Sequence, residues 1–378
     1  MKRFFVLISM LTLVAFCPVG VSAQGDNKAQ SEPQVSARAY VLFCADNGQI
    51  LAGDNVHTKL GMASTTKVMT SLITLCEAAA SDRKVKFTAA MTAEGSSMYL
   101  KVGDVVKLSD LAAGMMTVSG NDAANAAAVA IGGSLEGFAK LMNERAQQIG
   151  MKNTNFVTPS GLSHDDHYST AYDMALLMTC AMENEDFADL TAKKNVVVDF
   201  VSPESQRVTY NNHNRLLSMY EYCIGGKTGY TKSTGRCLVT CAEKEGLRLV
   251  AVTLNDRNDW QDHIALYEYG FSNYCALSTL EDTQVYKVPV EGGEEDSVQA
   301  YIPLPQKVVL TKADAENIRK EVKLLPVAYA PVEKGDMLGK VVYLAGEKEV
   351  LSVPLVAKNN VEKKESFWLV RLFRSLFK

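Results

Sequence analysis

Three short motifs contain the residues of this chain that are most able to do chemistry. They are Ser64-Thr65-Thr66-Lys67, Ser119-Gly120-Asn121 and Lys227-Thr228-Gly229, in that order. A serine hydroxyl is a poor nucleophile at neutral pH and needs a base within hydrogen-bond reach, which a lysine one helical turn away can supply. Together the motifs predict an active-site serine enzyme that uses a lysine as its base.

The setting of Ser64 separates it from a chance match. Ser81 and Lys84 have the same spacing but lie in a charged turn. Ser64 instead precedes an apolar run with helical spacing, made up of Val68, Met69, Leu72, Ile73, Leu75 and Cys76. We therefore expect Ser64 to open a helix, where the positive end of the helix dipole stabilises the negative charge that develops on its oxygen.

The second motif and the lysines Lys67 and Lys227 could assist the attack by Ser64. Lys67 can accept a proton only if its pKa falls, which burial and the charge of Lys227 would both favour. Ser119 and Asn121 can point into one cleft from a loop or tight turn, the hydroxyl relaying a proton and the amide holding a substrate amide. Gly120 between them allows the tight approach.

The third motif lies on a predicted strand. Lys227 and Thr228 offer a cation and a hydrogen-bond donor that suit a terminal carboxylate, and Gly229 leaves room for a substrate backbone alongside. The backbone N–H groups of Ser64 and Tyr230 would then form an oxyanion hole.

The sequence predicts an α+β framework for these motifs. The predicted elements are a hairpin over residues 37–54, a helical stretch over 108–131, a helix capped by Thr170, and strands over 236–242 and 247–254. We therefore predict an antiparallel sheet packed against a helical cluster, with the third motif on an edge strand.

The composition changes near Leu280, beyond which six of the ten prolines lie. Alternating segments and a hairpin over residues 338–356 indicate a separate small β domain without chemistry of its own. Its acidic stretch, residues 291–296, is typical of a solvated loop rather than a metal site.

The two ends of the chain predict export and attachment to a membrane. Residues 1–23 combine a basic start, an apolar centre and the cleavage pattern Val21-Ser22-Ala23, which predicts a signal peptide. The polar residues 24–34 predict a flexible lead-in. Within residues 361–378, Arg371, Arg374 and Lys378 fall on one helical face, opposite a broad apolar face, which favours an amphipathic helix in a membrane interface over one that packs back onto the protein.

Cysteine usage and charge exclude other classes. The seven cysteines that remain after removal of the signal peptide lie in apolar segments without a CxxC pattern, which argues against a disulfide framework. The formal net charge is −4 and no basic cluster interleaves with aromatic residues, so nucleic acid is not an expected partner.

The motifs resemble those of the low-molecular-mass penicillin-binding proteins, the serine D-alanyl-D-alanine carboxypeptidases of the SxxK superfamily. Residues 161–174 and 212–217 also resemble family segments. The resemblance implies that Ser64 is the acylated nucleophile, Lys67 its base, and Ser119 with Asn121 the second catalytic element. The substrate-binding residues that it implies are Lys227, Thr228, Gly229 and Tyr230, the last standing where some members have histidine.

The resemblance also implies a domain layout and partners. The family's small C-terminal β domain and amphipathic anchor match the layout that the sequence predicts, which has a catalytic domain over residues 35–278, a small β domain over 281–358 and a membrane anchor over 361–378. The expected partners are peptidoglycan pentapeptide, β-lactam inhibitors and the membrane surface, with no cofactor and no metal. We expect an exported enzyme at the outer face of the cytoplasmic membrane that removes the terminal D-alanine from pentapeptide stems.

Three other interpretations compete with this one. A class A β-lactamase shares two motifs but needs an E-x-x-x-N pattern, absent here between the second and third motifs, and usually has aspartate in place of Gly120. A zinc peptidase could use His164 and His167, but a glutamate-bearing helix is missing, so we expect His167 to hold its loop by hydrogen bonds. A catalytically silent peptidoglycan-binding protein is disfavoured by the intact motifs. Arg215 and Arg257 could hold a substrate carboxylate but fit structural roles better.

Overall fold

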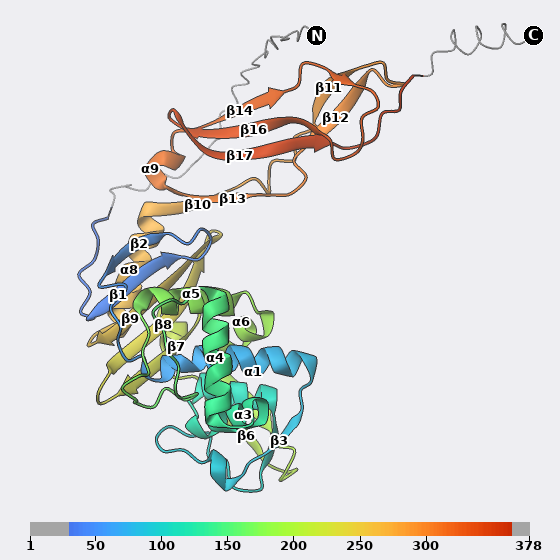
Figure 1. Ribbon diagram of the computed structural model, residues 1–378. Coiled ribbons are helices and arrows are strands. Elements are labelled where there is room, and N and C mark those ends of the chain that lie inside the picture. Colours follow the sequence, from blue (N-terminus) through green and yellow to red (C-terminus); the bar gives the residue numbers. More distant parts are fainter. Residues whose placement is uncertain (1–29, 365–378) are drawn as a thin grey trace, which may run out of the picture. The chain divides into compact units, whose positions relative to one another are not determined.

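The computed structural model describes residues 30–364 (Figure 1). The chain divides between Asn273 and Tyr274 into two compact units. The predicted signal peptide, the first residues of the predicted lead-in and most of the predicted anchor lie outside the described residues.

A five-stranded antiparallel sheet forms the centre of the larger unit. Its strands lie in the order β2-β1-β9-β8-β7. Their bounds are β1 (Ala39–Cys44), β2 (Ile50–Asp54), β7 (Cys223–Thr231), β8 (Gly235–Lys244) and β9 (Leu247–Asp256). The predicted antiparallel sheet is confirmed, and the third motif lies on its edge strand β7.

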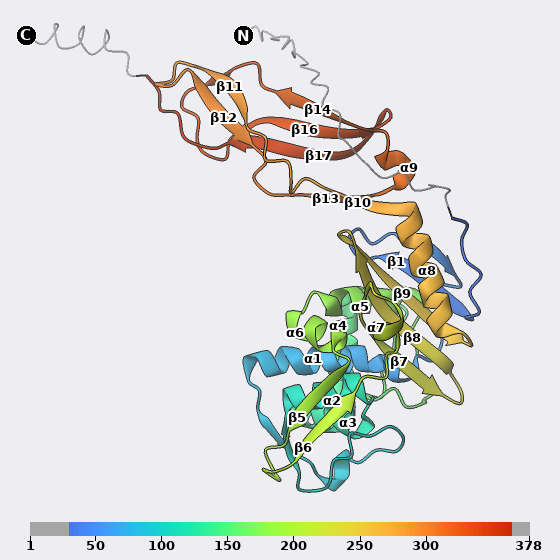
Figure 2. The ribbon, with the colours of Figure 1, turned by 180° about the vertical axis from the view of Figure 1, so that it is seen from behind.

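Helices cover both faces of this sheet. Helix α8 (Asp259–Asn273) lies on one face and α5 (Ala171–Met182) on the other (Figure 2). Alternation along β8 explains this arrangement, because Val239 joins the core shared with the helical cluster while Thr240 forms hydrogen bonds with His263 and Tyr267 of α8.

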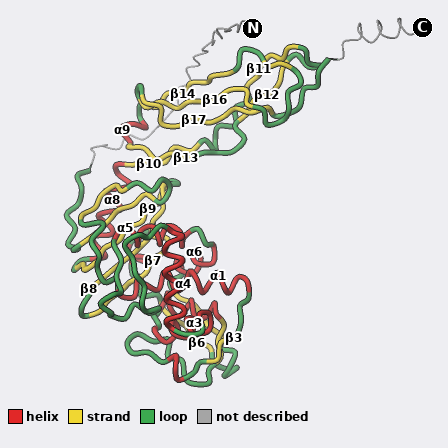
Figure 3. The backbone as a smooth tube through the Cα atoms, viewed as in Figure 1, coloured by secondary structure: helices red, strands yellow, loops and turns green. Residues whose placement is uncertain are grey.

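Most of the remaining helices form a cluster beside α5 (Figure 3), while α7 contacts strand β7. The remaining helices are η1 (Ala63–Thr66), α1 (Lys67–Ala80), η2 (Ala89–Met91), α2 (Leu108–Thr117), α3 (Asn121–Gly132), α4 (Leu135–Ile149), α6 (Glu185–Ala192) and α7 (Leu216–Met219). Two small hairpins complete the unit, β3 (Lys84–Lys86) with β4 (Val105–Lys107) and β5 (Asn195–Asp199) with β6 (Arg207–Asn211).

Two predicted helices differ in detail from the observed ones. Ser64 lies in the 3₁₀ turn η1, so the α-helix itself begins at Lys67. The predicted helical stretch over residues 108–131 is two helices, because the chain breaks at residues 118–120, where the second motif lies. The predicted cap of α5 is confirmed, since the hydroxyl of Thr170 accepts a hydrogen bond from the backbone N–H of Asp173 at 3.0 Å.

The smaller unit is mostly β-structure, as predicted. Its six-stranded sheet has the order β14-β16-β17-β12-β11-β15, and β10 pairs with β13. The bounds are β10 (Tyr274–Ser278), β11 (Tyr286–Glu291), β12 (Ser297–Tyr301), β13 (Lys307–Thr311), α9 (Lys312–Ala315), β14 (Ile318–Leu324), β15 (Ala328–Tyr329), β16 (Met337–Ala345) and β17 (Lys348–Ala357). Because of the β10–β13 pairing, residues 274–278 group with this unit, whereas the sequence placed them in the first domain.

The start of the predicted amphipathic helix is not helical. Val361 and Lys363 form isolated bridges with Val332 and Gly293, respectively, so residues 361–364 are extended, and the rest of the predicted helix lies outside the described residues. Within residues 30–364, no helix is both long enough and apolar enough to span a bilayer. None of the seven cysteines in that range forms a disulfide.

Candidate active site

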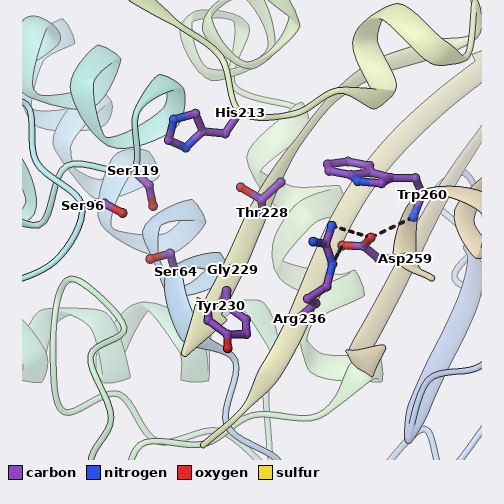
Figure 4. Close-up of a pocket in the computed structure, with 10 residues that line it drawn as sticks. All are labelled: Ser64, Ser96, Ser119, His213, Thr228, Gly229, Tyr230, Arg236, Asp259 and Trp260. Carbon is purple, nitrogen blue, oxygen red and sulfur yellow. Dashed lines mark hydrogen bonds and ion pairs between the residues drawn. The ribbon is translucent and has the colours of Figure 1, made fainter. Parts of the chain in front are cut away.

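The three predicted motifs meet at one pocket of about 290 Å³ in the larger unit. Ser64, Ser119 and Thr228 line it, each from a different segment, as Figure 4 shows. The pocket is also lined by Ser96, His213, Gly229, Tyr230, Arg236, Asp259 and Trp260. Three buried residues support the two serines. Lys67 forms hydrogen bonds with Ser64 and Asn121, and Lys227 forms one with Ser119.

Lys67 is in position to receive the proton of Ser64. Its Nζ lies 3.0 Å from Ser64 Oγ and 2.7 Å from Asn121 Oδ1, and it also donates to the backbone carbonyl of Ser160. The amide oxygen and the carbonyl can only accept hydrogen bonds. A neutral amine has two N–H groups and one lone pair, so once it donates to these two acceptors its lone pair is left for the Ser64 hydroxyl.

The electrostatics of Lys67 favour this neutral form. Burial is the largest cause that holds the pKa of Lys67 well below its usual value, and the charge of Lys227 acts in the same direction. Asp122 opposes both. Burial and Lys227 are the two causes that the sequence predicted.

The second motif occupies the break between α2 and α3. Ser119 has a φ of 60°, a left-handed conformation that ends α2 and turns its hydroxyl into the pocket. Asn121 is the first residue of α3, and its side-chain N–H donates to the carbonyl of Glu94 at 2.6 Å while its oxygen accepts from Lys67. The Asn121 amide therefore has a protein partner at each end, and its hold on a substrate amide stays a prediction.

Lys227 supports Ser119 from strand β7. Its Nζ donates to Ser119 Oγ at 3.1 Å and to the carbonyl of Thr228 at 2.9 Å. Burial lowers the pKa of Lys227 to about 7. Near neutral pH this lysine can therefore serve either as a cation or as a partner in proton transfer.

Gly229 brings strand β7 against the turn that carries Ser64. A Cβ at this position would lie 2.9 Å from the backbone N of Ser64 and 3.0 Å from that of Thr65. The lack of a side chain thus permits a contact inside the protein, in addition to the room for substrate that the motif predicted. The side chain of Tyr230, the next residue, is exposed at the pocket.

One wall of the pocket was not predicted from the sequence. Arg236 makes two hydrogen bonds to the buried carboxylate of Asp259, at 2.7 and 3.1 Å, and its guanidinium lies 5.7 Å from the ring of Trp260. Arg236 pairs with Tyr230 across the β7–β8 ladder. Pairing the predicted strands residue by residue would have shown that Arg236 lies beside the third motif. The two arginines that the sequence analysis considered, Arg215 and Arg257, do not line the pocket.

His213 is a further pocket residue that sequence reasoning missed, although residues 212–217 were noted for their resemblance to the family. Burial, followed by the charge of Lys227, lowers the pKa of the His213 imidazole. A neutral imidazole is therefore the favoured form at this edge of the pocket.

His167 holds its loop by hydrogen bonds, as predicted. Its Nδ1 accepts from the backbone N–H groups of Val157 and Thr158, and its Nε2 lies 2.8 Å from Thr66 Oγ1. His164 is exposed on the same loop. Among the described residues, no group of three or more His, Cys, Asp or Glu side chains could hold a metal ion.

Comparison with protein families identifies both parts of the chain. A family model described as D-alanyl-D-alanine carboxypeptidase matches residues 26–258. The chain belongs to this family. It is a serine-type D-alanyl-D-alanine carboxypeptidase of the penicillin-binding protein group, which acts on the cell wall. Residues 279–363 match the model described as penicillin-binding protein 5, C-terminal domain.

Individual relatives agree with this assignment. The carboxypeptidase is 31% identical to the D-alanyl-D-alanine carboxypeptidase DacF of Bacillus subtilis, over 96% of this chain and 95% of the relative. A crystal structure of penicillin binding protein 5 from Haemophilus influenzae matches with a TM-score of 0.70 at 28% identity, covering 88% of this chain and 100% of that one. A D-alanyl-D-alanine carboxypeptidase structure from Mycobacterium tuberculosis H37Rv matches with a TM-score of 0.60 at 31% identity, covering 65% of this chain and 94% of that one.

Proposed function

We propose that this carboxypeptidase is exported and removes the terminal D-alanine from peptidoglycan pentapeptide stems through an acyl-enzyme on Ser64. The observation that carries the proposal is the buried amine of Lys67, which lies 3.0 Å from Ser64 Oγ. With acceptor-only groups on its other two sides, a neutral Lys67 directs its lone pair at the serine.

In the proposed acylation, Ser64 Oγ forms a bond to the carbonyl carbon of the penultimate D-alanine as Lys67 takes the hydroxyl proton. The backbone N–H groups of Ser64 and Tyr230 stabilise the oxyanion. The C–N bond then breaks, and the leaving D-alanine amine receives a proton through Ser119, which Lys227 holds at 3.1 Å. Water attacks the ester in the second half of the reaction and restores the Ser64 hydroxyl.

The substrate carboxylate lies, in this proposal, beside Lys227 and Thr228. Arg236 contributes a third polar group on the same pocket, and its partner Asp259 fixes the guanidinium in one orientation. A β-lactam carries both a strained amide and a carboxylate, so it would occupy the same positions and acylate Ser64.

The test is D-alanine release from a pentapeptide ending in D-Ala-D-Ala, measured for the wild type, Ser64→Ala and Ser81→Ala. Ser81 shares the Ser-x-x-Lys spacing but caps the far end of α1, so it is a matched control. We expect Ser64→Ala to lose at least about a thousandfold in rate, because the nucleophile is gone, and Ser81→Ala to be unchanged.

Labelling with a fluorescent penicillin completes this test. The wild type should retain the label for much longer than one catalytic cycle, because the chain lacks the E-x-x-x-N pattern that drives deacylation in class A β-lactamases. Rapid turnover of penicillin, or release that persists in Ser64→Ala, would contradict the proposal.

We further propose that residues 1–23 direct export and that the chain beyond Lys364 attaches the enzyme to the outer face of the cytoplasmic membrane. The support is the pattern of cations on one helical face and aromatic and aliphatic residues on the rest. Such a helix lies in the interface and does not span the bilayer.

A further inference from the structure

The carbonyl of Ser160 has a specific part in orienting Lys67. A neutral lysine that accepts the Ser64 proton must direct both of its N–H groups elsewhere, and Asn121 and Ser160 supply the two acceptors. Asn121 is fixed by its own hydrogen bond to Glu94. The Ser160 carbonyl lies outside any helix or strand, so its position depends on what holds the surrounding loop.

The loop that carries Ser160 is tied to neighbouring segments on both sides of this carbonyl. The hydroxyl of Thr70 in α1 donates to the carbonyl of Pro159 at 2.6 Å. Gly161 packs so closely that a Cβ there would lie 2.0 Å from the carbonyl oxygen of Ala63. On the N-terminal side of the loop, Val157 and Thr158 donate their backbone N–H groups to His167.

His167 joins the loop to the start of α1 through its two ring nitrogens. Because Nδ1 accepts from two N–H groups, at 2.9 and 3.3 Å, the ring proton must lie on Nε2, which donates to Thr66 Oγ1 at 2.8 Å. Thr66 is the residue immediately before Lys67. Burial lowers the pKa of His167 to about 4, so the ring keeps this single neutral tautomer at neutral pH.

We propose that His167 is a positioning residue for the general base. By spanning from the N–H groups of residues 157 and 158 to Thr66, it holds the Ser160 carbonyl against Lys67 and so directs the lysine lone pair at Ser64. This inference rests on the proposed function. His167 does not line the pocket, so it acts on the chemical step and not on substrate binding.

Two substitutions separate the two ends of the imidazole. In His167→Asn the side-chain oxygen can replace Nδ1 and accept from the loop, whereas in His167→Gln the side-chain nitrogen can replace Nε2 and donate to Thr66. His164→Ala, an exposed histidine of the same loop, is the matched control. The rate of acylation by a fluorescent penicillin and the dissociation constant of the preceding noncovalent complex are measured for each variant as pH is varied.

We expect His167→Asn to acylate within about tenfold of the wild type and His167→Gln to lose about a hundredfold, with unchanged dissociation constants. In the Gln variant the N–H groups of Val157 and Thr158 lose their acceptor, so the Ser160 carbonyl is held only through Thr70 and the packing of Gly161, and water reaches Lys67. Because burial is the main cause of the low pKa of Lys67, its pKa rises and the acid limb of the rate profile moves to higher pH. His164→Ala should match the wild type in rate and profile.

Equal rates for the Asn and Gln variants would overturn the inference. So would a slower Gln variant whose acid limb stays at the wild-type pH, because a merely structural loss reduces the active fraction without changing the base. Titration of the active sites with the labelled penicillin corrects each rate for protein that is not folded. A wild type that takes up no label at Ser64 would instead contradict the proposed function.

Discussion

At the scale of single residues, Gly229 is the clearest example of a position fixed by a contact between distant segments. A Cβ there would meet the backbone nitrogens of Ser64 and Thr65 and the carbonyl of Met62, all within about 3.0 Å. Backbone atoms of two packed elements cannot move aside as a flexible side chain can. Strand β7 and the Ser64 turn would therefore have to separate.

We expect Gly229→Ala to lower penicillin acylation by about a hundredfold and to cost about 1–3 kcal/mol in the free energy of unfolding. Gly61→Ala is the comparison variant, because a Cβ at that position would meet only the side chain of Thr234, whose Cγ2 would lie 2.5 Å away and can turn aside, whereas the backbone atoms that face Gly229 cannot. Acylation rates and urea unfolding curves measure the two effects. A Gly229→Ala enzyme that acylated at the wild-type rate would contradict the close packing of β7 against the Ser64 turn.

At the scale of elements, the break between α2 and α3 stores strain at the second motif. Ser119 adopts a φ of 60°, which costs an L-residue about 1–2 kcal/mol relative to glycine. Ser119→Ala and Ser119→Gly both remove the hydroxyl that Lys227 contacts, so they differ mainly in backbone freedom.

We expect Ser119→Gly to be more stable than Ser119→Ala by about 0.5–1 kcal/mol, because relief of the left-handed conformation exceeds the entropy that glycine adds to the unfolded chain. Urea unfolding of the two proteins measures the difference. If the alanine variant proved equally stable or more stable, the strain at this break would be absent in solution.

Local patterns predicted the strands of the central sheet, the helix after Ser64 and the helix capped by Thr170, whereas α4, α6, α8 and the two small hairpins of the larger unit were not predicted. Alternation predicted the hairpins over residues 37–54 and 338–356, and the spacing of Thr170 to Asp173 predicted the cap of α5. The alanine-rich residues on either side of the second motif favour a helix, so the stretch over residues 108–131 was predicted as helical throughout, although Ser119 and Gly120 are poor helix formers and mark the break between α2 and α3. Part of the candidate site likewise depends on tertiary contacts that local sequence patterns do not show. Motif spacing identified Ser64 and Lys67, whereas Arg236 and the Ser160 carbonyl reach the site only through strand register and loop packing.

At the scale of the whole molecule, the proposed chemistry and the proposed attachment to a membrane involve different parts of the chain. All the residues of the candidate active site lie before Asn273, the carboxypeptidase family model ends at residue 258, and the model of the C-terminal domain begins at residue 279. The Mycobacterium tuberculosis carboxypeptidase structure aligns over 94% of its length with only 65% of this chain, so a family enzyme of this fold exists without the full second unit. The larger unit should therefore carry the catalytic activity alone.

A truncation series tests both assignments. The mature chain is compared with forms that end at Lys364 and at Asn273, the first cut preserving the bridges of Val361 and Lys363 to the smaller unit. We expect the mature chain to sediment with vesicles of anionic phospholipid and both shorter forms to stay in solution, because only the mature chain keeps the predicted amphipathic segment. All three should react with penicillin at rates within about threefold of one another, since the pocket is complete in each.

A form ending at Lys364 that still sedimented would contradict the anchor. A folded form ending at Asn273 that failed to react would show that catalysis requires the second unit.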